Sequence, residues 1–496
     1  MSTATVHDVI TSEDEARALG LAADGLWIAG EVVAARSGAT MPVDDPATGR
    51  PLADVADADE QDATTALDHA VEVADTWART PPRERGEILR RAYELVTQRA
   101  DDLALLMTLE MGKPLAEARG EVAYSAEFLR WFSEEAVRVA GRWSTSPDGA
   151  TRLLTMKRPV GPTLMVTPWN FPLAMGARKI GPAVAAGCTM VVKPASQTPL
   201  SMYALARLLQ EAGLPDGVLN VVTTRRSGAV VGSLLKDRRL RKLTFTGSTE
   251  VGRVLVEQSA RNLLRVSMEL GGNAPFLVMA DADLDAAVDG AMVAKMRTMG
   301  EACTAANRFL VHASVAEDFA SRLAHRMSRL RVGRGTDPGV QVGPLIDGRS
   351  RDDVDALVQD ARDTGADVLT GGEPLPGAGS FYAPTVLSGV APGTRLLEEE
   401  IFGPVAPVVP FDTVEDALET ANGTDYGLVA YAYTRDLSLA LRLSEELDTG
   451  MVGINQGLVS NPAAPFGGVK HSGFGREGGP EGIEEYLETR YVGIKP

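Results

Sequence analysis

Short apolar runs alternate with stretches of helical length over most of the chain after Leu153. The runs "GPTLMVTPW", "CTMVVKPAS", "LNVVTT" and "KLTFTGS" are rich in β-branched residues, and segments long enough for a helix separate them. Strands that alternate with helices indicate βαβ units, whose strands form a parallel sheet. The sequence therefore predicts an α/β protein.

A second region with the same alternation follows the first. It begins near "NAPFLVMADADLDAAVDGAM" and continues through "GVQVGPLID", "ADVLTGG" and "GLVAYAYTRD", with Cys303 early in it. A chain of 496 residues is also too long for a single hydrophobic core. We therefore expect two or three domains, of which two are α/β.

The rest of the chain shows three simpler patterns. From about Pro82 to Gly141 the apolar residues recur at spacings of three and four, which predicts helices that act as a packing scaffold. The segment "GRWSTSPDGATRLLTMKRPVG" indicates a hairpin, and the final "EEYLETRYVGIKP" ends in a strand-like run. Either of these two segments suits an edge between subunits.

Composition limits the partners of this chain. The net charge of −18 argues against nucleic acid and against an anionic membrane surface, since both select basic faces. A small anionic substrate stays open, because local arginines override the global field. The first residues lack a basic and then apolar leader, and no apolar run is long enough to span a bilayer.

Cysteine and histidine usage completes this picture. Two cysteines that are far apart in the sequence make no disulfide framework, which favours a reducing compartment. The five histidines, His7 among them, show no paired spacing, and no CxxC motif is present. We therefore expect a cytoplasmic protein without a metal site.

Polar residues that follow the predicted strands are the candidates for a binding site, because ligands of parallel sheets bind beyond the carboxyl ends of the strands. These residues are Asn170, Lys193, Ser196, Ser248 and Glu269. Ser248 lies in "FTGSTEVG", where glycines flank a strand-to-helix turn that suits a phosphate at a helix N-terminus. The motif is not the usual GxGxxG, and Lys193 alone fits a surface lysine equally well.

Three residues could carry chemistry. Cys303 in "GEACTAANR" has small neighbours that leave its thiol accessible as a nucleophile, although a buried structural thiol, as expected for Cys188, is the commoner fate. Glu269, at a strand end before two glycines, suits a general base or a solvated charge. Asn170, between two prolines, suits an amide donor to an oxyanion or a turn asparagine.

The chain resembles the NAD(P)-dependent aldehyde dehydrogenases over nearly its whole length. The residues that carry the resemblance are "PWNFP", "KPASQTPLS", "FTGSTEVG", "MELGGNAP", "GEACTAANR", "EEIFGPV" and "PFGGVKHSGFGREGG". The resemblance implies a Rossmann-type cofactor-binding domain (1–136 and 156–269), an α/β catalytic domain (270–455), and a small β oligomerisation segment (137–155 and 480–496). It also implies a homodimer or a homotetramer.

The resemblance assigns roles to the catalytic residues. Cys303 forms a thiohemiacetal with the aldehyde, and Asn170 with the backbone N–H of Cys303 forms the oxyanion hole. Glu269 activates the water that hydrolyses the resulting thioester. The residues implied in cofactor binding are Trp169, Lys193, Ser196, Gly247, Ser248, Glu400 and Phe402.

Within the family, the chain looks closest to the succinate-semialdehyde dehydrogenases, above all in "GINQGLVSNPAAPFGGVKHSGFGREG". The resemblance implies a substrate site of Arg178, Arg297 and Ser460, which suits a distal carboxylate. Glutarate semialdehyde is a close alternative, because one methylene discriminates weakly. An alternative substrate is an uncharged or amino aldehyde, in which case the two arginines are structural. An alternative class is a catalytically silent binding protein.

Cofactor choice depends on Ser196. A glutamate often stands at this position in NAD-selective relatives, where its charge repels a 2′-phosphate. Serine leaves Lys193 free to pair with that phosphate, and Arg225 and Arg226 in the next loop lie where they could help, unless they are only an exposed pair. We therefore predict NADP as the preferred cofactor, with NAD also possible.

Two departures from the family pattern stand beside the nucleophile. Glu301 replaces the usual glutamine two residues before Cys303, and its charge would raise the pKa of the thiol if it pointed there; alternatively, it faces away and pairs elsewhere. Ala305 stands where some relatives carry a second cysteine, so a local disulfide switch is not expected.

Overall fold

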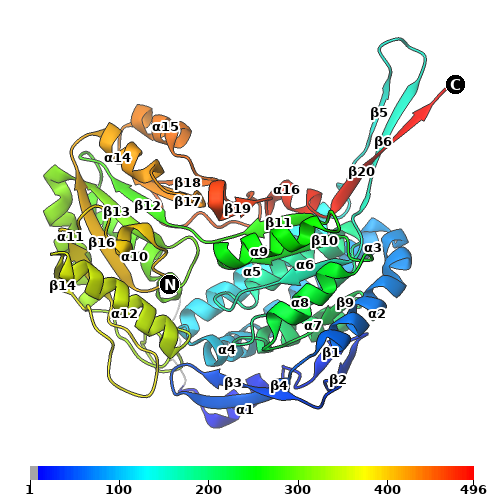
Figure 1. Ribbon diagram of the computed structural model, residues 1–496, viewed down its shortest axis with the longest axis horizontal. Helices are drawn as coiled ribbons and strands as arrows, with labels where there is room; N and C mark the ends of the chain where they lie inside the picture. The colour runs from blue at the N-terminus through cyan, green and yellow to red at the C-terminus, as the bar shows by residue number, and fades with distance from the viewer. Residues whose placement is uncertain (1–8) are drawn as a thin grey trace, which may run out of the picture.

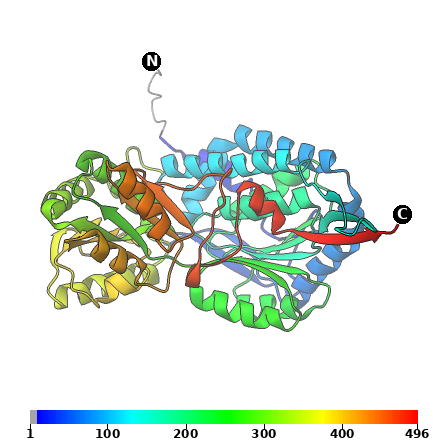
Figure 2. The ribbon, with the colours of Figure 1, turned by 90° about the horizontal axis from the view of Figure 1, so that it is seen from above.

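The structure is a computed structural model that describes residues 9–496. The predictions that concern the first eight residues, including His7 and the missing leader, lie outside the described residues. Two lobes, each built around one mainly parallel sheet, and a projecting three-stranded arm make up the molecule (Figure 1). Seen from above, the lobes lie side by side, and the arm extends from the end of the first lobe that is farther from the second (Figure 2).

The first lobe contains an eight-stranded sheet that is parallel from β11 to β9 and antiparallel at both edges. Its strands, in order across the sheet, are β19 (Gly473–Phe474), β11 (Arg265–Glu269), β10 (Lys242–Thr246), β7 (Thr163–Val166), β8 (Met190–Lys193), β9 (Leu219–Val221), β1 (Leu26–Ile28) and β2 (Glu31–Val33). Strands β7, β8 and β10 are buried along their whole length. They appear in the sequence as continuous apolar runs because both faces of the sheet are covered.

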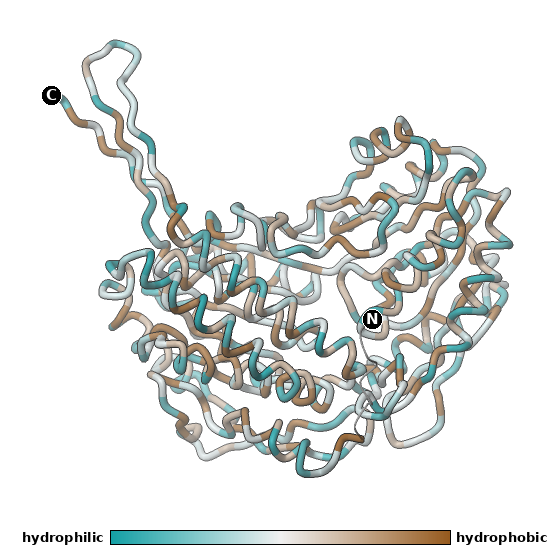
Figure 3. Tube along the Cα trace, turned by 180° about the vertical axis from the view of Figure 1, so that it is seen from behind, coloured by the Kyte–Doolittle hydropathy of each residue, from teal (hydrophilic) through white to brown (hydrophobic). Residues whose placement is uncertain are grey.

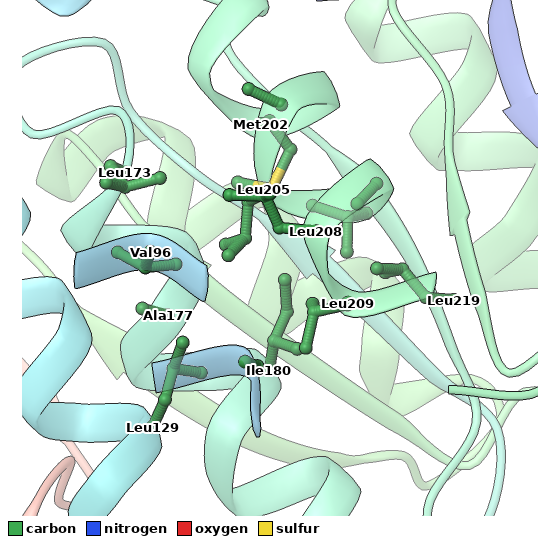
Figure 4. Packing of buried hydrophobic residues seen from close by; sticks show 14 of the residues in the cluster. Val96, Leu129, Leu173, Ala177, Ile180, Met202, Leu205, Leu208, Leu209 and Leu219 are labelled. Carbon is green, nitrogen blue, oxygen red and sulfur yellow. The ribbon is translucent and has the colours of Figure 1, made fainter. Parts of the chain in front are cut away.

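Helices cover both faces of this sheet. One face packs against α3 (Pro82–Gln98), α4 (Ala100–Met111), α5 (Leu115–Glu135), α6 (Ala174–Ala186) and α7 (Leu200–Glu211). The other packs against α2 (Glu60–Arg79), α8 (Ser227–Lys236) and α9 (Thr249–Ala260). Figure 4 shows part of the first core, where Ala177 and Ile180 of α6 lie near Leu205 and Leu209 of α7. Helices α3, α4 and α5 confirm the helical prediction for the region after Pro82.

The second lobe contains a seven-stranded sheet that is parallel except at the β14 edge. Its strands, in order, are β14 (Asp367–Thr370), β15 (Thr385–Ser388), β16 (Val405–Phe411), β13 (Ala306–His312), β12 (Ala274–Val278), β17 (Val429–Tyr433) and β18 (Met451–Ile454). The helices around it are α10 (Leu284–Met296), α11 (Ala313–Ser328), α12 (Gly348–Asp363), α13 (Arg395–Glu398), α14 (Val414–Asn422) and α15 (Leu437–Glu446). The two parallel sheets confirm the prediction of two α/β regions.

The arm consists of three antiparallel strands in the order β20 (Leu487–Ile494), β6 (Arg152–Pro159) and β5 (Arg142–Thr145). It confirms the hairpin and the terminal strand predicted from the sequence. Apolar residues recur along the arm as well as inside the lobes (Figure 3). The side chains of Trp143 and Tyr491 on this arm are 63% and 62% exposed.

Some elements were not anticipated in the sequence. Short strands β1 and β2 extend the first sheet, and β3 (Thr40–Asp45) pairs with β4 (Arg50–Ala56) as a separate hairpin after α1 (Ser12–Leu19). After β18 the chain returns to the first lobe through η2 (Lys470–Ser472), where β19 pairs with β11, and continues into α16 (Gly479–Glu484). None of the helices in residues 9–496 is both long and apolar enough to cross a bilayer.

Candidate active site

A cavity of about 240 Å³ has walls from both lobes. Parallel strands end at the same edge of a sheet, so the loops after β7, β10 and β11 meet there and face the loop before β13. The predicted site residues that line this cavity are Trp169, Asn170, Arg178, Gly247, Ser248, Glu269, Arg297, Cys303, Glu400, Phe402 and Ser460. The fold thus brings together side chains that are up to about 290 positions apart in the chain, from Trp169 to Ser460.

Cys303 follows a tightly wound turn. In η1 (Arg297–Gly300), Thr298 and Met299 have φ values of 52° and 53°, and Gly300 has a φ of 80°. A Cβ on Gly300 would lie 2.1 Å from the carbonyl oxygen of Gly403, so this position requires glycine. Strained backbone of this kind persists where the surrounding structure fixes it, and here it fixes the position of the thiol.

The Cys303 thiol is neutral in this environment. Burial raises its pKa to about 12, against the opposing effect of Arg178, while Glu400 and Glu269 add to the rise. Cys188, the other cysteine, is fully buried between α6 and β8, where its Sγ lies 3.4 Å from the carbonyl oxygen of Tyr486. Of the two thiols, only that of Cys303 lines the cavity.

Asn170 is held firmly beside the thiol. Its Nδ2 donates to the carbonyl oxygen of Glu301 at 2.9 Å, and its Oδ1 accepts from the N–H of Phe171 at 3.1 Å. Lys113 donates from Nζ to the Asn170 carbonyl oxygen at 2.8 Å. Because only one Nδ2 hydrogen is used in this way, the other is available to a ligand in the cavity.

Glu269 is a buried carboxyl group without partners. Its side chain ends β11, is 3% exposed, and neither oxygen has a hydrogen-bond partner within residues 9–496. Burial, reinforced by the nearby charge of Glu477, raises its pKa well above the usual range. A carboxyl group with a raised pKa that faces a cavity is suited to accept a proton from a bound molecule.

Glu477 has the opposite environment. Burial works to raise its pKa, but Lys179 and Arg178 outweigh burial and lower it. Its Oε2 lies 2.6 Å from Nη2 of Arg178, an ion pair rather than a well-aligned hydrogen bond. The sequence "GREGG" predicted no role for Glu477, because only the tertiary structure shows which charges surround it.

The two arginines of the cavity therefore differ. Arg178 is buried, pairs with Glu477 and lies over the ring of Phe466, with 4.0 Å from its Cζ to the ring centroid. The guanidinium of Arg297 has no ion pair and no hydrogen bond within the described part of the chain, and it lies 4.7 Å from the centroid of Phe171. Arg297 is thus a cation that stays available in the same cavity as Cys303.

Several features suit a dinucleotide. Ser248 caps α9, so the N-terminus of this helix opens at the cavity, and the buried Oγ1 of Thr246 beside it lacks a partner within residues 9–496. Glu400 accepts at Oε1 from the N–H of Gly272 at 3.1 Å, and burial raises its pKa to about 7. The donor and acceptor groups present fit a phosphate and a ribose.

Trp169 and Phe402 form one wall of this region. Their rings meet edge to face with centroids 5.4 Å apart. Phe402 has a φ of 51°, an uncommon conformation for a bulky residue, which indicates that the surrounding loop fixes it. Both rings line the cavity that contains Cys303.

Lys193 and Ser196 do not line the cavity that contains Cys303. Lys193, at the end of β8, donates from Nζ to Oγ of Ser227 at 3.0 Å, and burial lowers its pKa to about 8. Ser196 lines a second cavity together with Arg225. Arg225 and Arg226 are exposed, and the structure shows no ion pair of either side chain within residues 9–496.

Glu301 turns away from the thiol, which is the second of the two orientations considered from the sequence. Its Oε1 accepts from the N–H of Ile346 at 3.0 Å.

The cavity is also lined by three aromatic residues that the sequence did not indicate, Tyr124, Phe171 and Phe466. They were missed because aromatic residues in helices and loops carry no signal of their own. No group of three or more His, Cys, Asp or Glu side chains in residues 9–496 is arranged to hold a metal ion.

A buried thiol, a fixed amide and an unpartnered carboxyl group around one cavity define an enzyme of acyl chemistry, and the sheet beside it suits a dinucleotide. The chain belongs to the aldehyde dehydrogenase family, whose model matches residues 32–492. It is therefore an oxidoreductase that acts on aldehydes.

Comparison with individual relatives narrows the class. The chain is 61% identical to a succinate-semialdehyde dehydrogenase of Paenarthrobacter nicotinovorans, over 89% of this chain and 98% of that protein. It is 48% identical to the succinate-semialdehyde dehydrogenase (NADP(+)) GabD of Escherichia coli strain K12, over 94% and 97%. It is 47% identical to a glutarate-semialdehyde dehydrogenase of Pseudomonas aeruginosa, over 95% and 96%.

Solved structures agree with the fold. The crystal structure of a succinate-semialdehyde dehydrogenase from Burkholderia pseudomallei matches with a TM-score of 0.95 and 47% identity, over 96% of this chain and 99% of that one. The aldehyde dehydrogenase-like fold expected from the sequence is thereby confirmed.

Proposed function

We propose that this enzyme oxidises succinate semialdehyde to succinate, with NADP as its preferred cofactor. The observation that carries the proposal is the unpaired guanidinium of Arg297 in the cavity of Cys303. A cation without an ion pair in a cavity favours an anionic ligand, and a carboxylate fits the planar fork of a guanidinium. Relatives named for succinate semialdehyde support this substrate.

The carboxylate end of the substrate binds at Arg297, with Ser460 lining the same cavity and Arg178 adding positive charge from within its ion pair. The aldehyde end then lies at Cys303. This arrangement selects for aldehydes that carry a distal anion. It also accounts for the alternative, glutarate semialdehyde, because one additional methylene changes the binding free energy by only about 1–3 kcal/mol.

Acyl transfer begins when Cys303 Sγ passes its proton through water to the Glu269 carboxylate, which later releases it to solvent, and bonds to the aldehyde carbon. The carbonyl oxygen gains negative charge, which the free Nδ2 hydrogen of Asn170 and the N–H of Cys303 stabilise. When bound, the nicotinamide supplies the acceptor for the hydride that leaves this carbon. Cys303 then holds the acyl group as a thioester.

Glu269 completes the cycle. Its carboxylate accepts a proton from a water molecule, which attacks the thioester carbon and releases the acid and the thiolate of Cys303. The raised pKa of Glu269 makes its ionised form a stronger base, although a smaller fraction is ionised at neutral pH. Deacylation is therefore expected to accelerate as pH rises through the pKa of this group.

The preference for NADP rests on the residues around β8. Ser196 carries no negative charge that would repel a 2′-phosphate, and Lys193 and Arg225 are the nearby cations. Acidic residues such as Asp44 and Asp347 in the same second cavity weaken this electrostatic preference, so use of NAD is expected as well. The Escherichia coli relative is named for NADP(+).

The proposal extends to the assembled enzyme. We expect a homodimer or a homotetramer in the cytoplasm, in which the segments 137–155 and 480–496, which overlap the arm, join subunits. The cofactor would bind to 1–136 and 156–269, and 270–455 would supply the nucleophile. The exposed aromatic side chains of the arm support this arrangement.

The test compares initial rates with succinate semialdehyde, glutarate semialdehyde and butyraldehyde, each with NADP and with NAD. Butyraldehyde is the matched control, because it lacks only the distal carboxylate. The expected result is a kcat/KM for succinate semialdehyde at least tenfold above that for butyraldehyde. Equal values would show that Arg297 does not bind a carboxylate and would contradict the proposed substrate, while the family assignment would stand.

A further inference from the structure

Glu301 is a fully buried acidic residue two positions before the nucleophile, and it takes no part in the catalytic steps of Cys303 and Glu269. Its side chain is 0% exposed. Oε1 accepts from the N–H of Ile346 at 3.0 Å, while Oε2 has no hydrogen-bond partner within residues 9–496. Through its backbone, the same residue accepts the hydrogen bond from Nδ2 of Asn170 at 2.9 Å.

Within residues 9–496 no cation forms an ion pair with Glu301. Lys113 acts on it through its charge, but its Nζ already pairs with Oε2 of Glu121 and donates to the carbonyl oxygen of Asn170 at 2.8 Å. The loop that supplies Ile346 continues into Asp347, whose carboxylate adds negative charge. The N–H of Ile346 and the charge of Lys113 favour ionisation of Glu301 and Asp347 opposes it, so burial is the dominant effect against its ionisation.

The energetic consequence is large. A buried carboxylate without a paired cation costs several kcal/mol, and proteins usually avoid this cost by keeping the group protonated. Burial accordingly raises the pKa of Glu301 well above its usual range, against the hydrogen bond from Ile346 and the charge of Lys113, while Asp347 adds to the rise. Burial thus favours the carboxylic acid form of Glu301, which still accepts from Ile346.

We propose that Glu301 is a positioning residue that acts in its uncharged form: it ties the loop of Ile346 to the backbone carbonyl that orients the Asn170 amide, and its ionisation weakens the oxyanion site. The inference rests on the proposed role of Asn170. An ionised Glu301 would add a buried negative charge behind the backbone carbonyl that orients the Asn170 amide, in a region where water does not screen it.

Stability measurements test the charge state without any substrate. An ordinary glutamate in the unfolded chain has a pKa of about 4.3, so between that pH and the raised pKa of folded Glu301 unfolding releases a proton. Rising pH through this range therefore favours the unfolded state of the wild type. Glu301→Gln removes this effect, so its Tm relative to wild type should increase from about pH 5 to pH 9.

Glu419→Gln is the matched control, because it makes the same chemical change on an exposed face of α14. Its Tm difference from wild type should stay nearly constant across this range. If the curves for Glu301→Gln and wild type run parallel, Glu301 is ionised in the folded protein, and the proposal is overturned.

Activity measurements test the coupling to Asn170. With any aldehyde that the enzyme oxidises, kcat of the wild type should decline on the alkaline side, and Glu301→Gln should lack that decline while keeping kcat at pH 7 within about threefold. Glu301→Met, which removes the acceptor for Ile346, should lower kcat roughly tenfold at every pH. An alkaline decline that persists in Glu301→Gln would overturn the coupling. If the wild type did not oxidise succinate semialdehyde, only the proposed substrate would be contradicted, and the role of Glu301 would still be tested with another aldehyde.

Discussion

Arg178 and Arg297 show how two identical side chains in one cavity acquire different functions. The charge of Arg178 is compensated by Glu477, so its removal would leave a buried carboxylate with Lys179 as its remaining partner. The charge of Arg297 is not compensated by any ion pair within residues 9–496. The physical environment, rather than residue type, therefore decides which arginine is free to bind an anionic substrate.

Substitution by methionine should separate these roles. Arg297→Met should lower kcat/KM for succinate semialdehyde by roughly 10- to 100-fold, since a hydrogen bond to a charged group contributes about 1.5–3 kcal/mol. The same substitution should leave kcat/KM for butyraldehyde nearly unchanged.

Arg178→Met should lower the free energy of unfolding by about 3 kcal/mol or more, because it breaks a buried ion pair. Steady-state rates and urea unfolding of both variants are the measurements, and an equal loss with both aldehydes for Arg297→Met would contradict the carboxylate site.

The protonation state of Cys303 gives a second prediction at this scale. With a pKa of about 12, the thiol of the cofactor-free enzyme is almost entirely protonated at pH 7. Alkylation of Cys303 by iodoacetamide should therefore accelerate about tenfold for each pH unit from 7 to 10. Mass spectrometry of the labelled peptide follows the reaction; fully buried Cys188 is the internal control, and a rate that is flat above pH 8 would show that the thiol ionises earlier.

At the scale of the element, the turn before Cys303 depends on a glycine. Gly300→Ala would place a Cβ 2.1 Å from the Gly403 carbonyl oxygen in backbone with φ of 80°. The control is Gly393→Ala, at a similar φ of 81° but with nothing within 4 Å of the added carbon. Both variants place alanine in left-handed backbone, which lowers the free energy of unfolding by about 1–2 kcal/mol.

Gly300→Ala should thus lose about 1–3 kcal/mol more unfolding free energy than Gly393→Ala, since only the former is overpacked. It should also lose most of its activity, because the η1 turn positions the thiol. Chemical unfolding and initial rates measure the two effects. Equal destabilisation of the two variants would mean that the loop of Gly403 moves aside easily.

At the scale of the whole molecule, the arm presents apolar surface with no partner inside the described part of the chain. Replacing Trp143 and Tyr491 together by glutamate should convert the proposed dimer or tetramer to smaller species, because it places charges on a surface that association would desolvate. Sedimentation velocity at several concentrations measures the distribution. Leu437→Glu, on the exposed side of α15, is a control for adding charge to an exposed apolar residue elsewhere.

Much of this protein could be predicted from its sequence. The alternation of apolar runs with helical lengths determined the two parallel sheets, because a strand covered on both faces needs a continuous apolar run. The placement of Asn170, Ser248 and Glu269 directly after such runs determined that they meet at one edge, because parallel strands share their direction. Local sequence was sufficient wherever periodicity or position in a strand fixes geometry.

Other features depended on the tertiary structure alone. Which charges compensate one another, such as Glu477 with Arg178 and Lys179, follows from packing between segments about 300 residues apart. The inward burial of Glu301 and the separation of Ser196 from the cavity of Cys303 are of the same kind. Burial and pairing are properties of the surroundings of a side chain in three dimensions, so the sequence determined which groups are present, and the fold decided which of them are charged, paired or free.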